Sequence, residues 1–172
     1  MIATDGYPHG LVEALEGAVL ATRGQVIVTS PLGEELFPCP HYARHGYVYW
    51  QQTPDLRLVL GGFRDLALDE ERTVVNETTP SIQARLAEYA EELVGRPVEI
   101  ARRWAGIFGM TADLLPLVGR VREGVWAACG YSGHGNVLGL ACGELVARAI
   151  LGEQPPLLDV FEPARTMGAA PV

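Results

Sequence analysis

Residues 124–152, GVWAACGYSGHGNVLGLACGELVARAILG, predict a strand, a glycine-rich turn and a helix in direct succession. The apolar run before the turn has the length of a buried strand, and Gly152 is well placed to end the helix. Such a turn collects unpaired backbone N–H groups and the positive end of the helix dipole at one point. We therefore expect an electron-rich group to be favoured at this turn.

The glycines of the turn allow a ligand to approach the backbone. Gly130, Gly133 and Gly135 have no Cβ and tolerate positive φ angles. The helix then opens with small residues at 139 and 141–143, so it can lie close to a sheet or to a flat ring. The order G-x-x-G-x-G differs from the G-x-G-x-x-G of a dinucleotide-binding loop, so this is not a pyrophosphate loop.

A purely structural turn is the alternative interpretation. In that case Ser132 and Asn136 only cap the helix, and His134 is satisfied by backbone groups. A hydrolase elbow, G-x-S-x-G, does not fit, because Gly133 follows Ser132 directly. No nucleophile and base pair is recognisable, so the sequence leaves the catalytic residues unknown.

The composition restricts the class of protein. With 172 residues, 48% of them hydrophobic, the chain suits one domain or two small ones. Its formal net charge of −8 argues against binding to nucleic acid or to anionic membranes. Neither a membrane-length apolar run nor a signal peptide is visible, so we expect a cytoplasmic protein. The three cysteines are scattered, which predicts free thiols and no metal site. They are Cys39, Cys129 and Cys142.

The middle of the chain predicts an α+β arrangement. Its β-branched and alternating segments predict strands, Pro54 and Asp55 predict a hairpin turn, and proline and glycine make 31–46 a loop. For the helix, Thr79 is a candidate cap, Pro80 suits the first turn and Gly95 the end. The predicted elements are a strand at 24–30, a hairpin at 47–63, a helix at 80–94 and a strand at 97–106.

Several of these stretches, taken in order, resemble the C-terminal part of FAD-dependent amine and amino-acid oxidases. RRWAGIFGMTADLLPLVG (102–119) and residues 124–152 resemble the W-A-G segment, the T-x-D-x-x-P-x-V-G segment, the glycine turn and the small-residue helix of the D-amino-acid oxidase, glycine oxidase and sarcosine oxidase group. YVYWQQTPDLRLVLGGF (47–63) resembles the hairpin of the substrate domain, and FEPAR (161–165) resembles the segment where such chains finish.

The resemblance implies a cofactor, a reaction and two sets of site residues. FAD would be the cofactor, and a hydride would pass from the substrate C–H next to nitrogen to flavin N5. The glycine turn would lie along the pyrimidine edge of the flavin, and an apolar pocket would take a small amine or amino acid. The cofactor residues would be Gly130, Tyr131, Ser132, Gly133, His134, Gly135 and Asn136, and the substrate residues Tyr49, Trp50 and Phe108.

One departure from the family pattern concerns the substrate. Phe108 stands where glycine oxidase-like and D-amino-acid oxidase-like enzymes place an arginine that binds the substrate carboxylate. In this respect the chain looks closer to the branch resembling gamma-glutamylputrescine oxidases, which act on amines. Arg64, Arg102 and Arg103 are candidates for a carboxylate clamp, with surface or interdomain pairing as the alternative.

A second departure concerns the nucleotide site. The sequence has no G-x-G-x-x-G, and MIATDGY resembles a strand that lies well inside these proteins. We therefore expect the C-terminal half of such an enzyme, completed by a missing half, a partner chain or a second copy. The expected domains are 1–23 and 109–172, both from the FAD-binding domain with partial Rossmann-like elements, and 24–108, the substrate domain. A non-catalytic, self-associating remnant is the alternative.

Overall fold

The computed structural model describes residues 1–166 of the chain. The chain forms two compact units, unit 1 (Met1–Thr22 with Ile107–Val172) and unit 2 (Arg23–Gly106). The predicted boundaries after residues 23 and 108 lie one and two residues from those of the structure. The assignment of the units to flavin and substrate binding stays a prediction. No helix within the described residues is long and apolar enough to cross a membrane.

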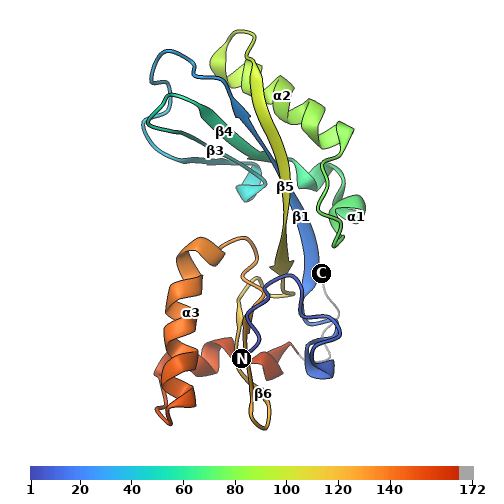
Figure 1. Ribbon diagram of the computed structural model, residues 1–172, viewed down its shortest axis with the longest axis vertical. Helices are drawn as coiled ribbons and strands as arrows, with labels where there is room; N and C mark the ends of the chain where they lie inside the picture. Colours follow the sequence, from blue (N-terminus) through green and yellow to red (C-terminus); the bar gives the residue numbers. More distant parts are fainter. Residues whose placement is uncertain (167–172) are drawn as a thin grey trace. The chain divides into compact units, whose positions relative to one another are not determined.

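Unit 2 is built on an antiparallel sheet whose strand order is β2-β3-β4-β1-β5 (Figure 1). The hairpin of β3 and β4 has the predicted position, and it pairs Trp50 with Leu60 and Tyr49 with Gly61. The segment 31–46, predicted as a loop, contributes β2 at the edge, because His41 pairs with Trp50. The strands are β1 (Leu20–Thr29), β2 (His41–Ala43), β3 (Val48–Gln52), β4 (Leu58–Gly62) and β5 (Ile100–Met110).

Helix α2 (Pro80–Val94) covers one face of this sheet (Figure 1). Its bounds are the predicted ones, because Pro80 suits the first helical position and Gly95 ends the helix with a φ of +75°. The main core lies between helix and sheet. Its buried members include Ile27, Leu58, Leu60, Phe63, Ile82 and Leu86. A sheet with one packed helix confirms the predicted α+β class. Short helices complete the unit: η2 (Arg44–Gly46), η3 (Arg64–Leu66) and α1 (Leu68–Glu71).

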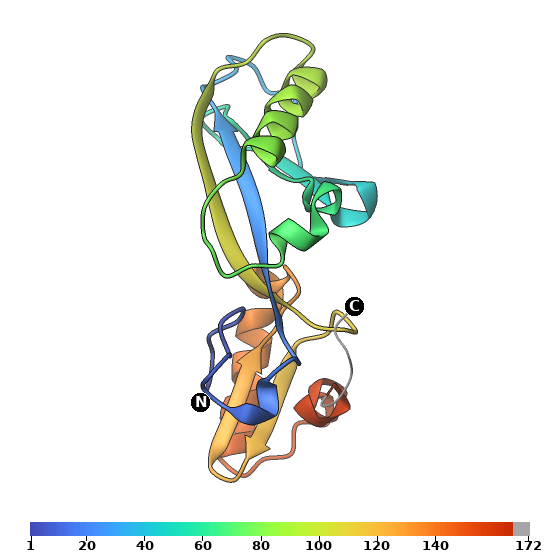
Figure 2. The same ribbon diagram turned by 90° about the vertical axis from the view of Figure 1, so that its right-hand side faces the viewer.

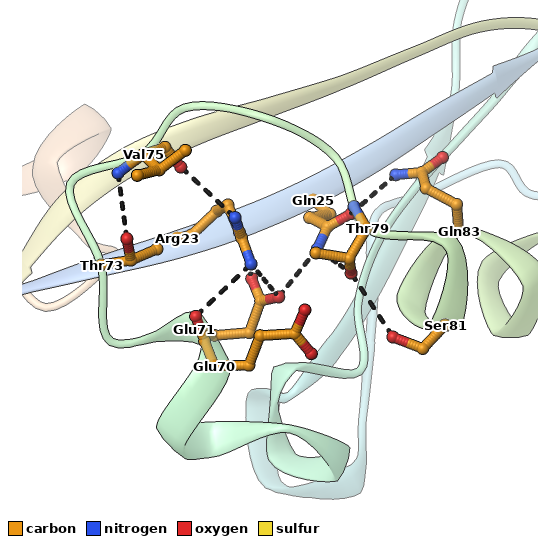
Figure 3. Close-up of polar contacts among 9 residues, drawn as sticks. All are labelled: Arg23, Gln25, Glu70, Glu71, Thr73, Val75, Thr79, Ser81 and Gln83. Carbon is orange, nitrogen blue, oxygen red and sulfur yellow. Dashed lines mark hydrogen bonds and ion pairs between the residues drawn. The ribbon is translucent and has the colours of Figure 1, made fainter.

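A buried polar network fixes the base of this helix to the sheet (Figure 3). The guanidinium of Arg23 donates from Nε and Nη2 to the two carboxylate oxygens of Glu71, at 3.0 and 2.9 Å. Their side chains are only 5% and 1% exposed. Gln25 donates to Glu71 and to the Thr79 hydroxyl, each at 2.8 Å. Thr79 is the N-cap residue of α2, as predicted, but its hydroxyl takes part in this network and makes no capping bond to the helix.

Unit 1 is layered around the hairpin of β6 (Leu117–Arg122) and β7 (Val125–Cys129) (Figure 2). Helix α3 (Gly135–Ile150) packs on one face through Cys142 and Val146. Leu15 and its neighbours pack on the other face. The strand predicted at the start of the chain is reduced to one parallel bridge, between Ile2 and Ala127. Further 3-10 helices are η1 (Glu13–Leu15), η4 (Pro156–Phe161) and η5 (Pro163–Arg165).

An ion pair joins two of the sequence motifs within unit 1. Arg165 of FEPAR donates to both carboxylate oxygens of Asp113, at 2.7 and 3.2 Å, and to the Leu115 carbonyl at 2.6 Å. The hydrogen bond from Arg165 holds the pKa of Asp113 below its ordinary value of 3.8. The pair therefore contributes stability above that pH, and the contribution is lost as pH falls through the lowered pKa of the folded state.

We expect Glu71→Gln to lower the free energy of unfolding by about 3–5 kcal/mol, because it leaves the Arg23 charge buried without its counterion. Urea unfolding followed by circular dichroism measures this loss. The adjacent Glu70 is exposed, so Glu70→Gln should stay within about 0.5 kcal/mol of the parent. Replacing both charges, in Arg23→Met with Glu71→Leu, should cost less than Glu71→Gln alone. Equal losses for Glu71→Gln and Glu70→Gln would contradict this account.

Asp113→Asn should make the melting temperature of the protein depend less on pH in the acid range. The parent loses the ion pair as Asp113 is protonated, whereas the variant has no carboxylate to titrate at this position. Melting temperatures recorded from about pH 6 to about pH 2 should therefore converge for parent and variant at the acid end. Arg165→Gln should give the same convergence, because it removes the other partner. Parallel curves across the whole range would show that the pair does not contribute.

Candidate functional site

The glycine loop 130–136 connects β7 to α3 and has a strongly constrained backbone. Gly130, Ser132 and Gly133 have φ angles of +70°, +52° and +88°. Ser132 is the unusual member, because residues other than glycine rarely adopt positive φ angles. Its N–H donates to the Gly109 carbonyl at 2.7 Å. Its hydroxyl accepts from the Thr111 N–H at 3.2 Å. These bonds hold the loop against the end of β5.

Three segments that are far apart in sequence meet behind this loop at glycines. A Cβ on Gly6 would lie 2.8 Å from the Phe108 carbonyl carbon. One on Gly109 would lie 2.7 Å from Val19, and one on Gly130 would lie 2.7 Å from Thr111. Such distances are too short for any larger residue to be accommodated without movement. The glycines therefore serve the backbone geometry as well as the access of a ligand.

The carboxylate of Asp5 connects the same three segments. One oxygen accepts the Gly109 N–H and the other accepts the Tyr131 N–H, each at 3.0 Å. No motif in the sequence indicates Asp5 as a site residue. Its only local signal is the turn pair Asp5-Gly6, which does not indicate partners more than 100 residues away. Burial also raises the pKa of the Tyr131 phenol to about 12, so its hydroxyl is neutral at physiological pH.

The N-terminus of α3 is open on the loop side. Val137 and Leu138 both donate to the His134 carbonyl, whereas the N–H groups of Gly135 and Asn136 have no acceptor within residues 1–166. Nδ1 of His134 lies 3.2 Å from the Ser132 carbonyl oxygen, which favours the tautomer with the proton on Nδ1. Neither Ser132 nor Asn136 caps the helix through its side chain.

The predicted substrate residues come from both units, and two of them point to opposite faces of one sheet. Phe108 lies in unit 1, where its ring would be 3.9 Å from a Cβ on Gly133. Tyr49 and Trp50 are adjacent on β3 and therefore point to opposite faces of the sheet. Trp50 packs toward α2, with its ring 6.0 Å from that of Tyr89. Its buried indole N–H has no partner within the described chain.

Tyr49 lies on the open face, which we define as the face of the unit 2 sheet opposite α2. Its ring crosses Gly61, where an added Cβ would be 2.5 Å away. The ring centroids of Tyr49 and Tyr42 are 6.2 Å apart. Burial raises the pKa of the Tyr49 phenol. Of the three predicted substrate residues, Tyr49 alone belongs to this open face.

The chain matches the family model described as FAD dependent oxidoreductase over residues 1–149. It is 30% identical over 162 residues to the probable oxidoreductase OrdL of Rhizobium meliloti (strain 1021), covering 91% of this chain and 36% of that protein. It is also 33% identical over 141 residues to the gamma-glutamylputrescine oxidoreductase of Escherichia coli (strain K12), covering 75% of this chain and 30% of that protein. The chain thus spans about a third of the length of these relatives.

Solved structures share the fold at lower identity. L-proline dehydrogenase from P. horikoshii superposes with a TM-score of 0.75 at 22% identity, over 96% of this chain and 46% of that chain. The likeness supports the mixed architecture of sheets and helices, and the sequence match extends through β7 and nearly all of α3. The chain therefore belongs to the family of FAD-dependent oxidoreductases.

Proposed function

We propose that this chain forms the flavin-edge and substrate-binding parts of an oxidase that acts on an amine or an amino acid. The observation that carries the proposal is the glycine loop, which is held rigidly by Asp5, Gly109 and Thr111 at the open N-terminus of α3. In a chain of this family, a preformed turn with free N–H groups suits one edge of a flavin ring.

The residues around the loop fit a flat cofactor. A Cβ added to Gly139 would meet no atom within 4 Å, so the side of α3 next to the loop is unobstructed there. The N–H groups of Gly135 and Asn136, with the positive end of the helix dipole, favour negative charge on the pyrimidine edge. When bound, FAD would supply the acceptor for a hydride from the substrate carbon next to nitrogen.

In this reaction the chain itself would bind and orient the flavin and the substrate. No pair of side chains in the described residues has the arrangement of an acid and a base beside the loop, so we assign no catalytic residue. Phe108 would give the loop an apolar neighbour. An amine substrate is consistent with the E. coli relative, whose name indicates action on gamma-glutamylputrescine.

We also propose that the nucleotide half of FAD is bound by sequence outside this chain. The printed sequence contains no G-x-G-x-x-G, and the chain covers 36% of the R. meliloti relative. Either further sequence of the same protein or a partner polypeptide would contribute that part.

Self-association without catalysis is the second candidate, and α3 supplies the observation in its favour. Val137, Leu140 and Leu151 of this helix and its C-terminal end are 75%, 84% and 80% exposed. Large apolar side chains grouped in this way commonly mark an interaction surface. A dimer formed through α3 would bury them.

We expect the chain, combined with excess FAD and with the sequence that binds its nucleotide half and then freed of unbound cofactor, to retain a visible flavin spectrum that bleaches when an amine is added without oxygen. Putrescine, gamma-glutamylputrescine, glycine and proline are the probes. Sedimentation velocity, followed by absorbance at the visible band of the flavin, reports the oligomeric state of the flavin-containing species in the same sample. An assembly that carries no flavin at any FAD concentration, even with that nucleotide-binding sequence present, would contradict the oxidase proposal and support the self-associating alternative.

Gly139→Leu should separate cofactor binding from folding. Leucine is a better helix former than glycine by up to about 1 kcal/mol, and the site is unobstructed, so the melting temperature should stay the same or rise. A side chain between α3 and the flavin should nevertheless weaken FAD binding about 10-fold or more, as measured by flavin fluorescence titration. Gly143→Leu, one helical turn further from the loop, is the matched control. Unchanged FAD affinity in Gly139→Leu would place the flavin elsewhere.

A further inference from the structure

A ring of hydrogen bonds closes the glycine loop onto the end of β5. The Ser132 N–H donates to the Gly109 carbonyl at 2.7 Å, and the Gly109 N–H donates to one oxygen of Asp5 at 3.0 Å. The other oxygen of Asp5 accepts the N–H of Tyr131, the residue before Ser132, at 3.0 Å. All of these residues belong to unit 1. Each member of the ring is therefore connected to two others, by a hydrogen bond or by the peptide bond.

A tight turn presents the carboxylate of Asp5 to this ring. The Tyr7 N–H donates to the Thr4 carbonyl, and the Thr4 hydroxyl donates to the Tyr7 carbonyl, each at 3.0 Å. Just before the turn, Ile2 forms a parallel bridge with Ala127 of β7. Because the two segments run in the same direction, Asp5 comes level with the residues that follow β7. The carboxylate is thus fixed beside the start of the loop.

Closing the ring requires a carboxylate at position 5. The N–H groups of Gly109 and Tyr131 bind to different oxygens of Asp5. An asparagine has the same size but only one oxygen, and its NH₂ group would face one of the two N–H donors. It can therefore accept from Gly109 or from Tyr131, but not from both. Asp5→Asn opens the ring at one bond and leaves the volume of the side chain nearly unchanged.

The ring separates the N–H groups that hold the loop from those that stay open to a ligand. The N–H groups of Tyr131 and Ser132 are bonded within the ring, and that of His134 donates to the Tyr131 carbonyl at 2.9 Å. At the start of α3, the N–H groups of Gly135 and Asn136 have no acceptor within residues 1–166. A loop fixed in this way does not have to be ordered when a ligand binds.

Resting on the proposed function, we propose that Asp5 is a positioning residue for the flavin. Its carboxylate acts through the backbone of the loop, because it fixes the Tyr131 N–H and thereby the direction of the open N–H groups at the start of α3. Donors that are fixed in advance bind a negatively charged edge without a cost of ordering. When the ring is open, FAD binding has to order the loop as well, so the affinity falls although the protein is folded.

The test compares Asp5→Asn with the parent, each combined with the sequence that binds the nucleotide half of FAD. The dissociation constant for FAD, from flavin fluorescence, should rise about 10-fold, the factor that corresponds to ordering one backbone residue. The visible absorption bands of the bound flavin should also shift, because fewer fixed N–H groups face its edge. Val146→Ala is the matched control. Val146 is fully buried on α3, so this variant loses stability but keeps the ring, and its dissociation constant and bands should equal those of the parent.

Hydrogen exchange of the parent gives a readout that requires neither a variant nor turnover. The amide hydrogens of Gly109, Tyr131 and Ser132 should be protected before FAD is added, and FAD should add little to this protection. Protection that develops only with FAD would overturn the inference. Equal dissociation constants in parent and Asp5→Asn, or equal losses of affinity in Asp5→Asn and Val146→Ala, would overturn it while leaving the proposed function in place. A parent that binds no FAD would overturn the proposed function and this inference together.

Discussion

The carboxylate of Asp5 is the contact on which the geometry of unit 1 depends. It accepts N–H groups from Gly109 and Tyr131, which lie 104 and 126 residues further along the chain. The three backbones can come this close only because Gly6, Gly109 and Gly130 have no side chains. Two partly buried N–H groups would lose their acceptor without Asp5, at a cost of about 1–3 kcal/mol for each. The shape of the glycine loop is therefore set by residues outside it.

The geometry of unit 2 depends in a similar way on a buried pair of opposite charges. The pair of Arg23 and Glu71 is almost completely removed from solvent, and buried pairs of this kind add less to stability than to the selection of one arrangement. Here the arrangement selected is the attachment of α2 to β1 through Gln25, and to β5 through Gln83 and Arg103. A shift of β5 by one residue would exchange the faces of Arg102 and Arg103. The network thus also decides which arginine reaches the open face.

Residue patterns within a short stretch of sequence predicted the helices and strands better than they predicted on which face of the sheet a side chain lies. The bounds of α2 follow from Pro80 and Gly95, and the β3–β4 hairpin follows from its turn residues, because these effects act within a few residues. Because side chains alternate along β3, Tyr49 and Trp50 have to point to opposite faces of the sheet. Only the packing of α2 shows which of the two faces the helix covers. Thr79 is the N-cap residue, as its type and position predict, but the sequence does not show that its hydroxyl accepts a hydrogen bond from Gln25, 54 residues earlier. Asp5 had no local pattern at all.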